Sequence, residues 1–144
     1  MQVGRLIKLV LASLLRSVDA RMQPLALTAM QWEPLLVLAL GRADTVAALA
    51  RECSMDCGAM TRMLDRLEHK QLLQRQRSHS DRRVVNLVLT PTGREAADRI
   101  PLIVRQELDL HLAGFTADEL QQLTGFLTRM LRNAEGSAAQ EAIE

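Results

Sequence analysis

The chain has 144 residues, 48% of them hydrophobic, which is enough for one ordinary domain with a hydrophobic core. Two phenylalanines, one tryptophan and no tyrosine are too few for a surface that stacks the bases of single-stranded nucleic acid. Charged residues interrupt every apolar stretch, so the pattern predicts neither a membrane span nor a secretory signal. With only two cysteines, we expect a reducing, cytoplasmic setting and no disulfide framework.

Charge is unevenly distributed along the chain, although the formal net charge is only +1. Residues 61–83 contain seven arginines and lysines and three acids, whereas residues 103–144 contain three arginines and seven acids. A local excess of positive charge favours contact with phosphates, and the acidic remainder is repelled by them. Contact with duplex DNA is therefore expected from the first of these segments.

The first predicted helix covers residues 3–22. Its apolar residues form a stripe wider than one packing partner covers: Val3, Leu6, Ile7, Val10, Leu11, Leu14, Leu15 and Val18. A second surface has to cover the excess, and a partner subunit is favoured over burial within so small a chain.

A second helix is predicted to begin at Thr28 and to include the run from Trp32 to Leu40. Thr28 and Gln31 have the spacing of a capping box at its start, and Leu27 with Trp32 has the spacing of the accompanying hydrophobic staple. Pro34 lies inside this helix and is expected to bend it. Gly41 is the expected C-terminal stop.

Residues 45–69 have the pattern of two helices joined by a turn at residues 53–56, with Asp56 as N-cap of the second helix, residues 57–69. Four residues of that helix form one apolar stripe: Met60, Met63, Leu64 and Leu67. The other side carries small residues first and cations after them: Gly58, Ala59, Thr61, Arg62 and Arg66, with Asp65 and His69. This layout is typical of a recognition helix, whose short N-terminal side chains let the backbone approach the major groove.

Two strand-like runs, residues 72–77 and 84–89, flank a polar loop with a basic tip that contains His79, Asp81, Arg82 and Arg83. Cations at such a tip suit the negative potential of a minor groove. A solvated helix face beside an ordinary turn is the competing interpretation. It is less favoured once helix and basic loop occur together.

Thr90 and Pro91 begin a long helix to about residue 113, which Pro101 should kink. Thr116 and Glu119 form a capping box before a last helix with one apolar side: Leu120, Leu123, Leu127, Met130 and Leu131. The expected fold class is mainly α (α+β), in one domain over residues 1–144. It comprises a winged helix-turn-helix (28–90, with the wing at 72–89), a connecting helix (91–113), and N- and C-terminal helices (1–27 and 114–144) that form a dimerisation region.

Several motifs carry a resemblance to a known family. They are Leu-Ala at 49–50, DCGAMTRMLDRLE at 56–68, SDRR at 80–83 and LVLTPTGR at 87–94. These residues resemble the MarR family of bacterial transcription regulators, and the resemblance covers nearly the whole chain. The Asp-Arg-Arg wing followed by Leu-Thr-x-x-Gly is its most specific part.

The resemblance implies a homodimer that binds a pseudo-palindromic DNA site, usually represses, and is released by a small molecule or an oxidant. It implies that Gly58, Ala59, Thr61 and Arg62 contact bases or phosphates. It also implies that Arg83 enters the minor groove and that Asp81 orients it. Arg82 and His79 are further candidates.

Members of the family often bind small aromatic or phenolic effectors between the dimer helices and the DNA-binding lobe. Arg21 and Trp32 are candidates for lining that crevice, although a single tryptophan after a staple also fits a core position.

Two residues depart from the family pattern. Pro34 replaces a helix former, and Ser54 replaces the usual turn glycine, which is tolerable if the φ of Ser54 stays negative.

The cysteines have different environments in this scheme. Cys53 is expected to pack as a small apolar residue. Cys57 lies in the first turn of the recognition helix, where the helix dipole favours a thiolate, so it is a candidate redox site. The two cysteines and three histidines lack the clustered spacing of a zinc site, and no metal or other cofactor is expected. Phosphate-binding glycine loops and nucleophile motifs are missing from the sequence, so an enzyme is not expected.

The predicted function is a dimeric, sequence-specific DNA-binding transcription regulator, a repressor that responds to a small aromatic or phenolic ligand. Two alternatives stay open. One is a thiol-based redox sensor acting through Cys57, and the other is a helical dimerisation or adaptor module that binds protein instead of DNA.

Overall fold

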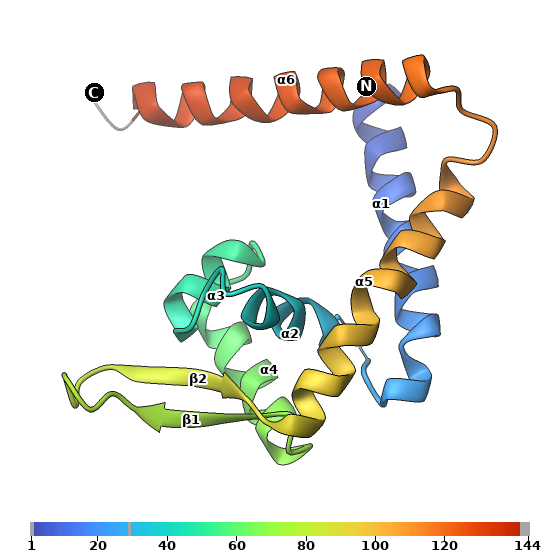
Figure 1. Cartoon of the computed structure of the whole chain (residues 1–144). Helices are drawn as coiled ribbons and strands as arrows, with labels where there is room; N and C mark the ends of the chain where they lie inside the picture. The colour runs from blue at the N-terminus through green and yellow to red at the C-terminus, as the bar shows by residue number, and fades with distance from the viewer. Residues whose placement is uncertain (1, 29, 142–144) are drawn as a thin grey trace. The chain divides into compact units, whose positions relative to one another are not determined.

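A computed structural model of the chain describes residues 2–28 and 30–141 (Figure 1). The chain forms two compact units, residues 1–111 and 112–144. The first unit contains α1 (Gln2–Arg21), the 3-10 turn η1 (Gln23–Leu25), α2 (Trp32–Ala39), α3 (Val46–Glu52), α4 (Cys57–His69), β1 (Leu73–Arg77), β2 (Val85–Leu89) and α5 (Pro91–His111). The second unit contains α6 (Ala117–Glu141). The predicted fold class, mainly helical with a two-stranded wing, is confirmed.

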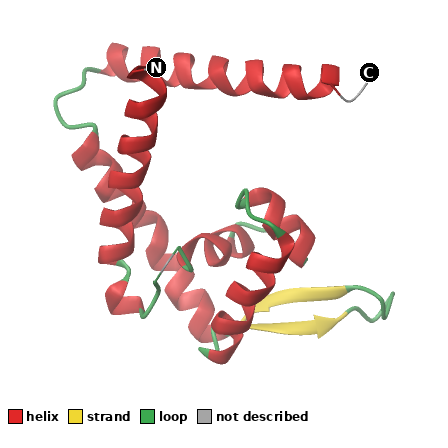
Figure 2. Ribbon diagram, turned by 180° about the vertical axis from the view of Figure 1, so that it is seen from behind, coloured by secondary structure: helices red, strands yellow, loops and turns green. Residues whose placement is uncertain are grey.

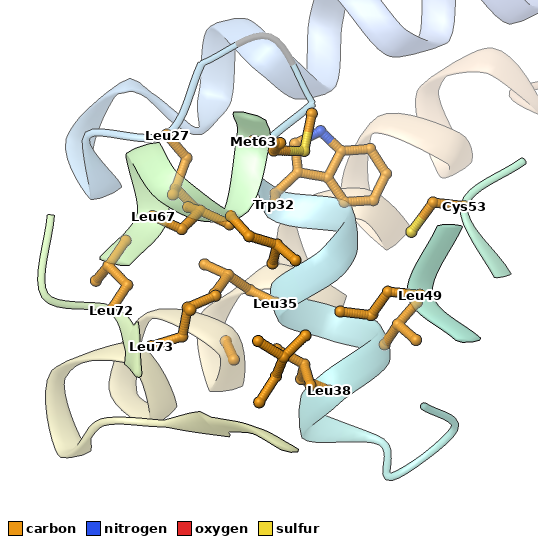
Figure 3. Packing of buried hydrophobic residues seen from close by; sticks show 14 of the residues in the cluster. Leu27, Trp32, Leu35, Leu38, Leu49, Cys53, Met63, Leu67, Leu72 and Leu73 are labelled. Carbon is orange, nitrogen blue, oxygen red and sulfur yellow. The ribbon is translucent and has the colours of Figure 1, made fainter. Parts of the chain in front are cut away.

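The core of the first unit is built around α2, which lies between α3 and α4 (Figure 3). Leu35 of α2, Leu49 of α3 and Leu67 of α4 are fully buried, and burying each such leucine contributes roughly 1.5–3 kcal/mol. The predicted inward stripe of α4 is confirmed, since all four of its residues are buried: Met60, Met63, Leu64 and Leu67. This packing leaves the opposite side of α4 in solvent.

The strands β1 and β2 form an antiparallel hairpin that extends away from the helices of the first unit (Figures 1 and 2). Leu73 pairs with Leu89 at its base, and Arg77 pairs with Val85 at its outer end. Leu73 at the base and Leu87 in the middle of β2 are buried in the core. The hairpin is therefore anchored at one end and free at the other.

The N-terminus of α5 is pressed against the chain that enters β1. The Thr90 hydroxyl donates to the carbonyl of Gln71, the residue before Leu72, at 2.7 Å. The same hydroxyl accepts from the Gly93 N–H at 3.0 Å. A Cβ at Gly93 would lie 1.7 Å from the Leu72 carbonyl oxygen. Only glycine fits there, which gives a physical reason for the glycine of the Leu-Thr-x-x-Gly motif.

Three helices of the first unit end in the same hydrogen-bonded motif. In each, the residue just after the C-cap has a left-handed backbone conformation. Gly41 follows α2 with φ +65°, as predicted, and its N–H donates to the Leu38 carbonyl at 3.1 Å. Ser54 follows α3 with φ +50°, and Gln71 follows α4 with φ +60°. The condition under which serine could replace the usual turn glycine without strain, a negative φ at Ser54, is therefore not met. The path of the turn between α3 and α4 requires the left-handed conformation whichever residue occupies it.

Two predictions at the start of α2 need correction. Pro34 is the third residue of α2, where an N–H has no partner within the helix, so no hydrogen bond is lost and the predicted bend has no cause there. The helix begins at Trp32, and of the predicted capping box only the bond from the Thr28 N–H to Gln31 Oε1 forms, at 3.3 Å. Ala29, which the box spans, lies outside the described residues.

The connecting helix α5 ends at His111, two residues before the predicted end, and runs on through Pro101. The kink at Pro101 stays a prediction.

In the second unit the capping box is confirmed. The Thr116 N–H donates to Glu119 Oε2 at 2.8 Å, and this bond holds the pKa of the Glu119 carboxyl below its ordinary value. Within residues 2–28 and 30–141, no helix combines the length and the apolar character that crossing a membrane requires.

Replacing Ser54 by glycine is expected to raise the free energy of unfolding by about 0.5–1 kcal/mol. The gain arises because a Cβ at positive φ costs ~1–2 kcal/mol, and it is partly offset by the larger entropy of glycine in the unfolded chain. Urea unfolding followed by circular dichroism measures the change. Gly41→Ser is the matched control, since it introduces at φ +65° the Cβ that the first variant removes, and it should destabilise the protein. Equal stability of the two variants and the parent would contradict this account.

Candidate nucleic-acid interface

The recognition helix α4 is fixed at its start by a side-chain cap. The Asp56 carboxylate accepts from the Ala59 N–H at 2.8 Å, as the sequence predicted. Gly58, Thr61, Arg62 and Arg66 are exposed on the side away from the core, and Ala59 is partly exposed. The first two turns of α4 therefore present small residues to solvent.

Gly58 and Arg62 are close neighbours on this surface. A Cβ built on Gly58 would lie 3.5 Å from Arg62 Nη1 and 3.2 Å from Asp56 Oδ1. The Arg62 side chain thus runs back toward the N-terminus of α4, as long side chains on helices do. The absence of a side chain at Gly58 leaves room for that guanidinium.

The wing loop is organised by its own short polar side chains. Asp81 Oδ1 accepts from the backbone N–H of Arg83 at 3.0 Å, and the Asp81 carbonyl accepts from the Val84 N–H at 3.0 Å. The Ser78 hydroxyl accepts from the N–H groups of Ser80 and Asp81 at 3.3 and 3.4 Å. Asp81 is thus joined to the main chain of Arg83 and not to its guanidinium. The four candidate residues of the loop are all exposed: His79, Asp81, Arg82 and Arg83.

Arg75, which the sequence did not single out, joins the wing to the recognition helix. Its Nη2 donates to Asp65 Oδ1 at 2.7 Å, its Nη1 pairs with Glu68 Oε2, and its backbone N–H donates to Glu68 Oε1 at 3.2 Å. Strand alternation offered a partial signal, because Leu73, Arg75 and Arg77 share the face that includes the buried Leu73. The sequence alone could not tell which arginine on that face meets the acids of α4.

Lys70, at the C-terminal end of α4, is a second cation that is engaged internally. Its Nζ donates to the Ala26 carbonyl at 2.5 Å and to Gln31 Oε1 at 2.6 Å. Gln31 is 3% exposed. This contact ties the end of the recognition helix to the segment that connects α1 with α2.

Comparison with known proteins decides which family this arrangement represents. Residues 27–85 match the model of the MarR family. The multiple antibiotic resistance protein MarR of Escherichia coli strain K12 is 34% identical over 130 residues, which are 90% of this chain and 90% of that protein. The MarR protein of Salmonella typhimurium gives the same identity and coverage. The chain belongs to the MarR family.

Solved structures agree with this assignment. A cysteine-to-serine variant of E. coli MarR, crystallised with operator DNA, is 31% identical and superposes with a TM-score of 0.82 over 91% of this chain and 94% of that one. The transcriptional regulator SlyA superposes with a TM-score of 0.87 over 95% of this chain and 96% of that one, and at 21% identity it shows the fold alone. The protein is therefore a MarR-family DNA-binding transcription regulator, and the family is not one of enzymes. The adaptor alternative has no support in these comparisons.

The two candidate effector residues have internal partners in this MarR-family fold. Trp32 is 8% exposed, and its indole N–H donates to Asp19 Oδ1 at 3.1 Å (Figure 3 shows the ring within the core). Arg21 pairs through Nε with Glu107 Oε1 at 3.3 Å and donates through Nη2 to Gln106 Oε1 at 2.9 Å. Both residues have a structural role in joining α1 to its neighbours. Their effector role stays a prediction.

The two cysteines differ in exposure, and the predicted burial of Cys53 is confirmed. Cys53 is buried, and burial, followed by the charges of Glu33 and Glu52, raises the pKa of its thiol to about 12. Cys57 is exposed and is the first residue of α4.

Of the three histidines, His69 and His79 are exposed. His111 lies between Ser13 Oγ, at 3.2 Å, and the Glu107 carbonyl, at 2.7 Å. Among the residues that the structure describes, no group of three or more potential metal ligands gathers.

Arg75→Ala is expected to lower affinity for operator DNA by about tenfold or more, roughly 1.4 kcal/mol, because it frees the wing and leaves two carboxylates beside the DNA-facing surface. The free energy of unfolding should fall by only about 1 kcal/mol or less, since partly exposed ion pairs contribute little. Fluorescence anisotropy and urea unfolding measure the two effects. Gln74→Ala, one residue earlier on the other face of β1, is the control. Equal loss of affinity in both variants would contradict the role of Arg75.

Iodoacetamide at pH 8 is expected to modify the folded protein once, at Cys57. The Cys53 thiol stays protonated at that pH, because its pKa of about 12 leaves almost no thiolate, and its burial excludes the reagent. Mass spectrometry of the intact protein and of its peptides counts and locates the adducts. In urea both cysteines should react. Rapid modification of Cys53 in the folded state would show that the α3–α4 turn opens readily.

Proposed function

We propose that the protein is a homodimeric repressor that binds a pseudo-palindromic operator and is released by a small aromatic or phenolic ligand. One observation carries the proposal. Five arginines of residues 61–83 are exposed without an internal side-chain partner in the described chain: Arg62, Arg66, Arg77, Arg82 and Arg83. Arg75 pairs with both acids of α4. Apart from Lys70 and the cluster of Arg75 with its two acids, the charged residues of 61–83 are five arginines and one acid, Asp81, which favours phosphate contact.

In this proposal α4 enters the major groove. Gly58 and Ala59 allow the close approach of the helix, and Thr61 presents its methyl group and an acceptor oxygen, since its hydroxyl donates to the Cys57 carbonyl at 2.8 Å. Arg62 reads a base edge or a phosphate, and Arg66 contacts phosphate one turn further along. The capped start of α4 points its unpaired backbone N–H groups the same way, which suits an anion.

The wing occupies the adjacent minor groove. Arg83 enters the groove, whose negative potential attracts the guanidinium, and Asp81 keeps its backbone in place. Arg82 and His79 contact the sugar-phosphate edges beside it. The E. coli variant crystallised with operator DNA supports this use of the fold.

Dimerisation is supported by apolar side chains that no surface in the described chain covers. On α1, Val3 is 61% and Val10 56% exposed, and on α6 Phe126, Leu127, Met130 and Leu131 are exposed. Such a large exposed apolar surface is unusual on a monomer. A two-fold dimer places two recognition helices about one DNA turn apart, ~34 Å, or a multiple of it. A regulator of this kind acts in the cytoplasm, where the bacterial genome lies.

The effector is proposed to bind near Arg21 and Trp32. Binding there would break the pair between Arg21 and Glu107 or separate the indole from Asp19, and either change would shift α1 relative to the DNA-binding helices. Trp32 is the single tryptophan of the chain, so its fluorescence reports directly on this site. Small aromatic acids that release DNA should also change that fluorescence.

Thiol oxidation is the second candidate for release, and the exposure of Cys57 at the start of α4 favours it. An adduct or disulfide at this position would stand between α4 and the groove. If Cys57→Ser leaves oxidant-induced release unchanged, this second mode is excluded and the aromatic effector remains.

The double variant Arg62→Ala with Arg83→Ala is expected to abolish retardation of a duplex that the parent protein selects from genomic DNA. Each of the two substitutions removes one exposed guanidinium, so the free energy of unfolding and the dimeric state should stay unchanged. Gel retardation over a series of salt concentrations, with light scattering for mass, makes the test. A monomeric parent protein, or one whose DNA affinity does not depend on salt, would contradict the proposal.

A further inference from the structure

We infer that Arg77, a residue outside the predicted contact set, binds the DNA backbone that separates the groove read by α4 from the groove read by the wing. The inference rests on the proposed function and extends it to a specific phosphate contact. Three observations carry it: the pairing of the neighbouring cations, the face of β1 on which Arg77 lies, and its position along the hairpin.

The seven cations of residues 61–83 divide into two groups. Lys70 donates inward to Ala26 and Gln31, and Arg75 is held by Asp65 and Glu68, so both cations are directed at partners within the protein. Arg77 is exposed and makes no side-chain hydrogen bond or ion pair within the described residues. Arg75 occupies both acids that Arg77 could otherwise have approached on α4. The guanidinium of Arg77 is therefore available to a ligand.

The face of β1 places Arg77 on the side of the recognition helix. Side chains two residues apart on a strand point to the same side. Leu73 points into the core, and Arg75 reaches the acids of α4, so this is the helix-facing side of the hairpin. Arg77 is the next residue on it and pairs with Val85. It lies one strand repeat, about 6.7 Å, further from the core than Arg75.

This position lies between the two DNA-reading elements. One strand of phosphates separates a major groove from the minor groove beside it, and a protein that reads both must cross that strand. A residue on the helix-facing side of the wing, between α4 and the loop tip, meets phosphates and no base edges. The planar guanidinium suits two oxygens of a phosphate. Arg77 should therefore contribute affinity without contributing sequence preference.

The test compares Arg77→Gln with Lys70→Gln, which removes the same charge from the same segment but from an inward-facing donor. The probe is a short duplex recovered from random-sequence DNA with the parent protein, beside a scrambled duplex of the same composition. We expect Arg77→Gln to flatten the plot of log affinity against log salt by about 0.9 for each lost phosphate contact, or about 1.8 for a dimer. Lys70→Gln should leave the slope as it is. Arg77→Lys keeps a phosphate-binding charge and should retain the parent slope.

The preference for the selected over the scrambled duplex is expected to stay the same in Arg77→Gln, because the affinities for the two duplexes fall by the same factor. Thermal unfolding checks that the variants are folded. A parent protein without salt-dependent DNA binding would overturn the proposed function itself. A parent that binds with a steep slope, beside an Arg77→Gln slope equal to that of Lys70→Gln, would overturn only the inference about Arg77. A changed sequence preference would do the same, since it would mean that Arg77 reads bases.

Discussion

The burial of one side of α4 against α2 is the constraint on which the rest of the structure depends. Met60, Leu64 and Leu67 are fully or almost fully buried against a core that includes Leu35 and Leu49. A helix whose apolar stripe is held this firmly cannot rotate about its own axis without exposing several large side chains. The residues on its other side therefore face solvent as one fixed set. Sequence-specific binding needs that rotational setting, because base edges are read by a few side chains at defined positions.

Polar contacts outside the core complete the positioning of the DNA-reading surface. Arg75 ties the hairpin to the middle of α4, and Lys70 ties the end of α4 to the segment between α1 and α2. Gly93 lets α5 begin directly against the carbonyl of Leu72, which fixes the base of the hairpin. Each of these contacts joins two elements that the hydrophobic core alone would leave free to shift. They also engage two of the seven cations of residues 61–83 within the protein, so five exposed arginines remain for contact with phosphates.

Helix ends show how far local rules extend. Asp56, Thr45 and Thr116 cap their helices as their residue types predict, because a cap uses partners two or three residues away. The φ of Ser54 is positive because the turn between α3 and α4 must reverse direction within the geometry imposed by two packed helices. A serine then accepts a left-handed backbone at a cost in stability that glycine would not have. The prediction that Pro34 bends α2 is wrong for a different reason. The helix begins at Trp32, so the proline lies in the first turn and removes no hydrogen bond of the helix.

The sequence by itself determined the order and type of the elements, the inward side of α4, the wing and the family. These follow from apolar periodicity, turn residues and short motifs, all of which are read within about ten residues of chain. Only the tertiary structure decided which arginine of β1 meets Asp65 and Glu68, where the Lys70 ammonium points, and that the indole of Trp32 donates to Asp19. The partners of Lys70 lie 44 and 39 residues away along the chain, and the partner of Trp32 lies 13 residues away. A cation with several acids and carbonyls within its reach selects among them by the packing of whole elements, and no local pattern in the sequence encodes that choice.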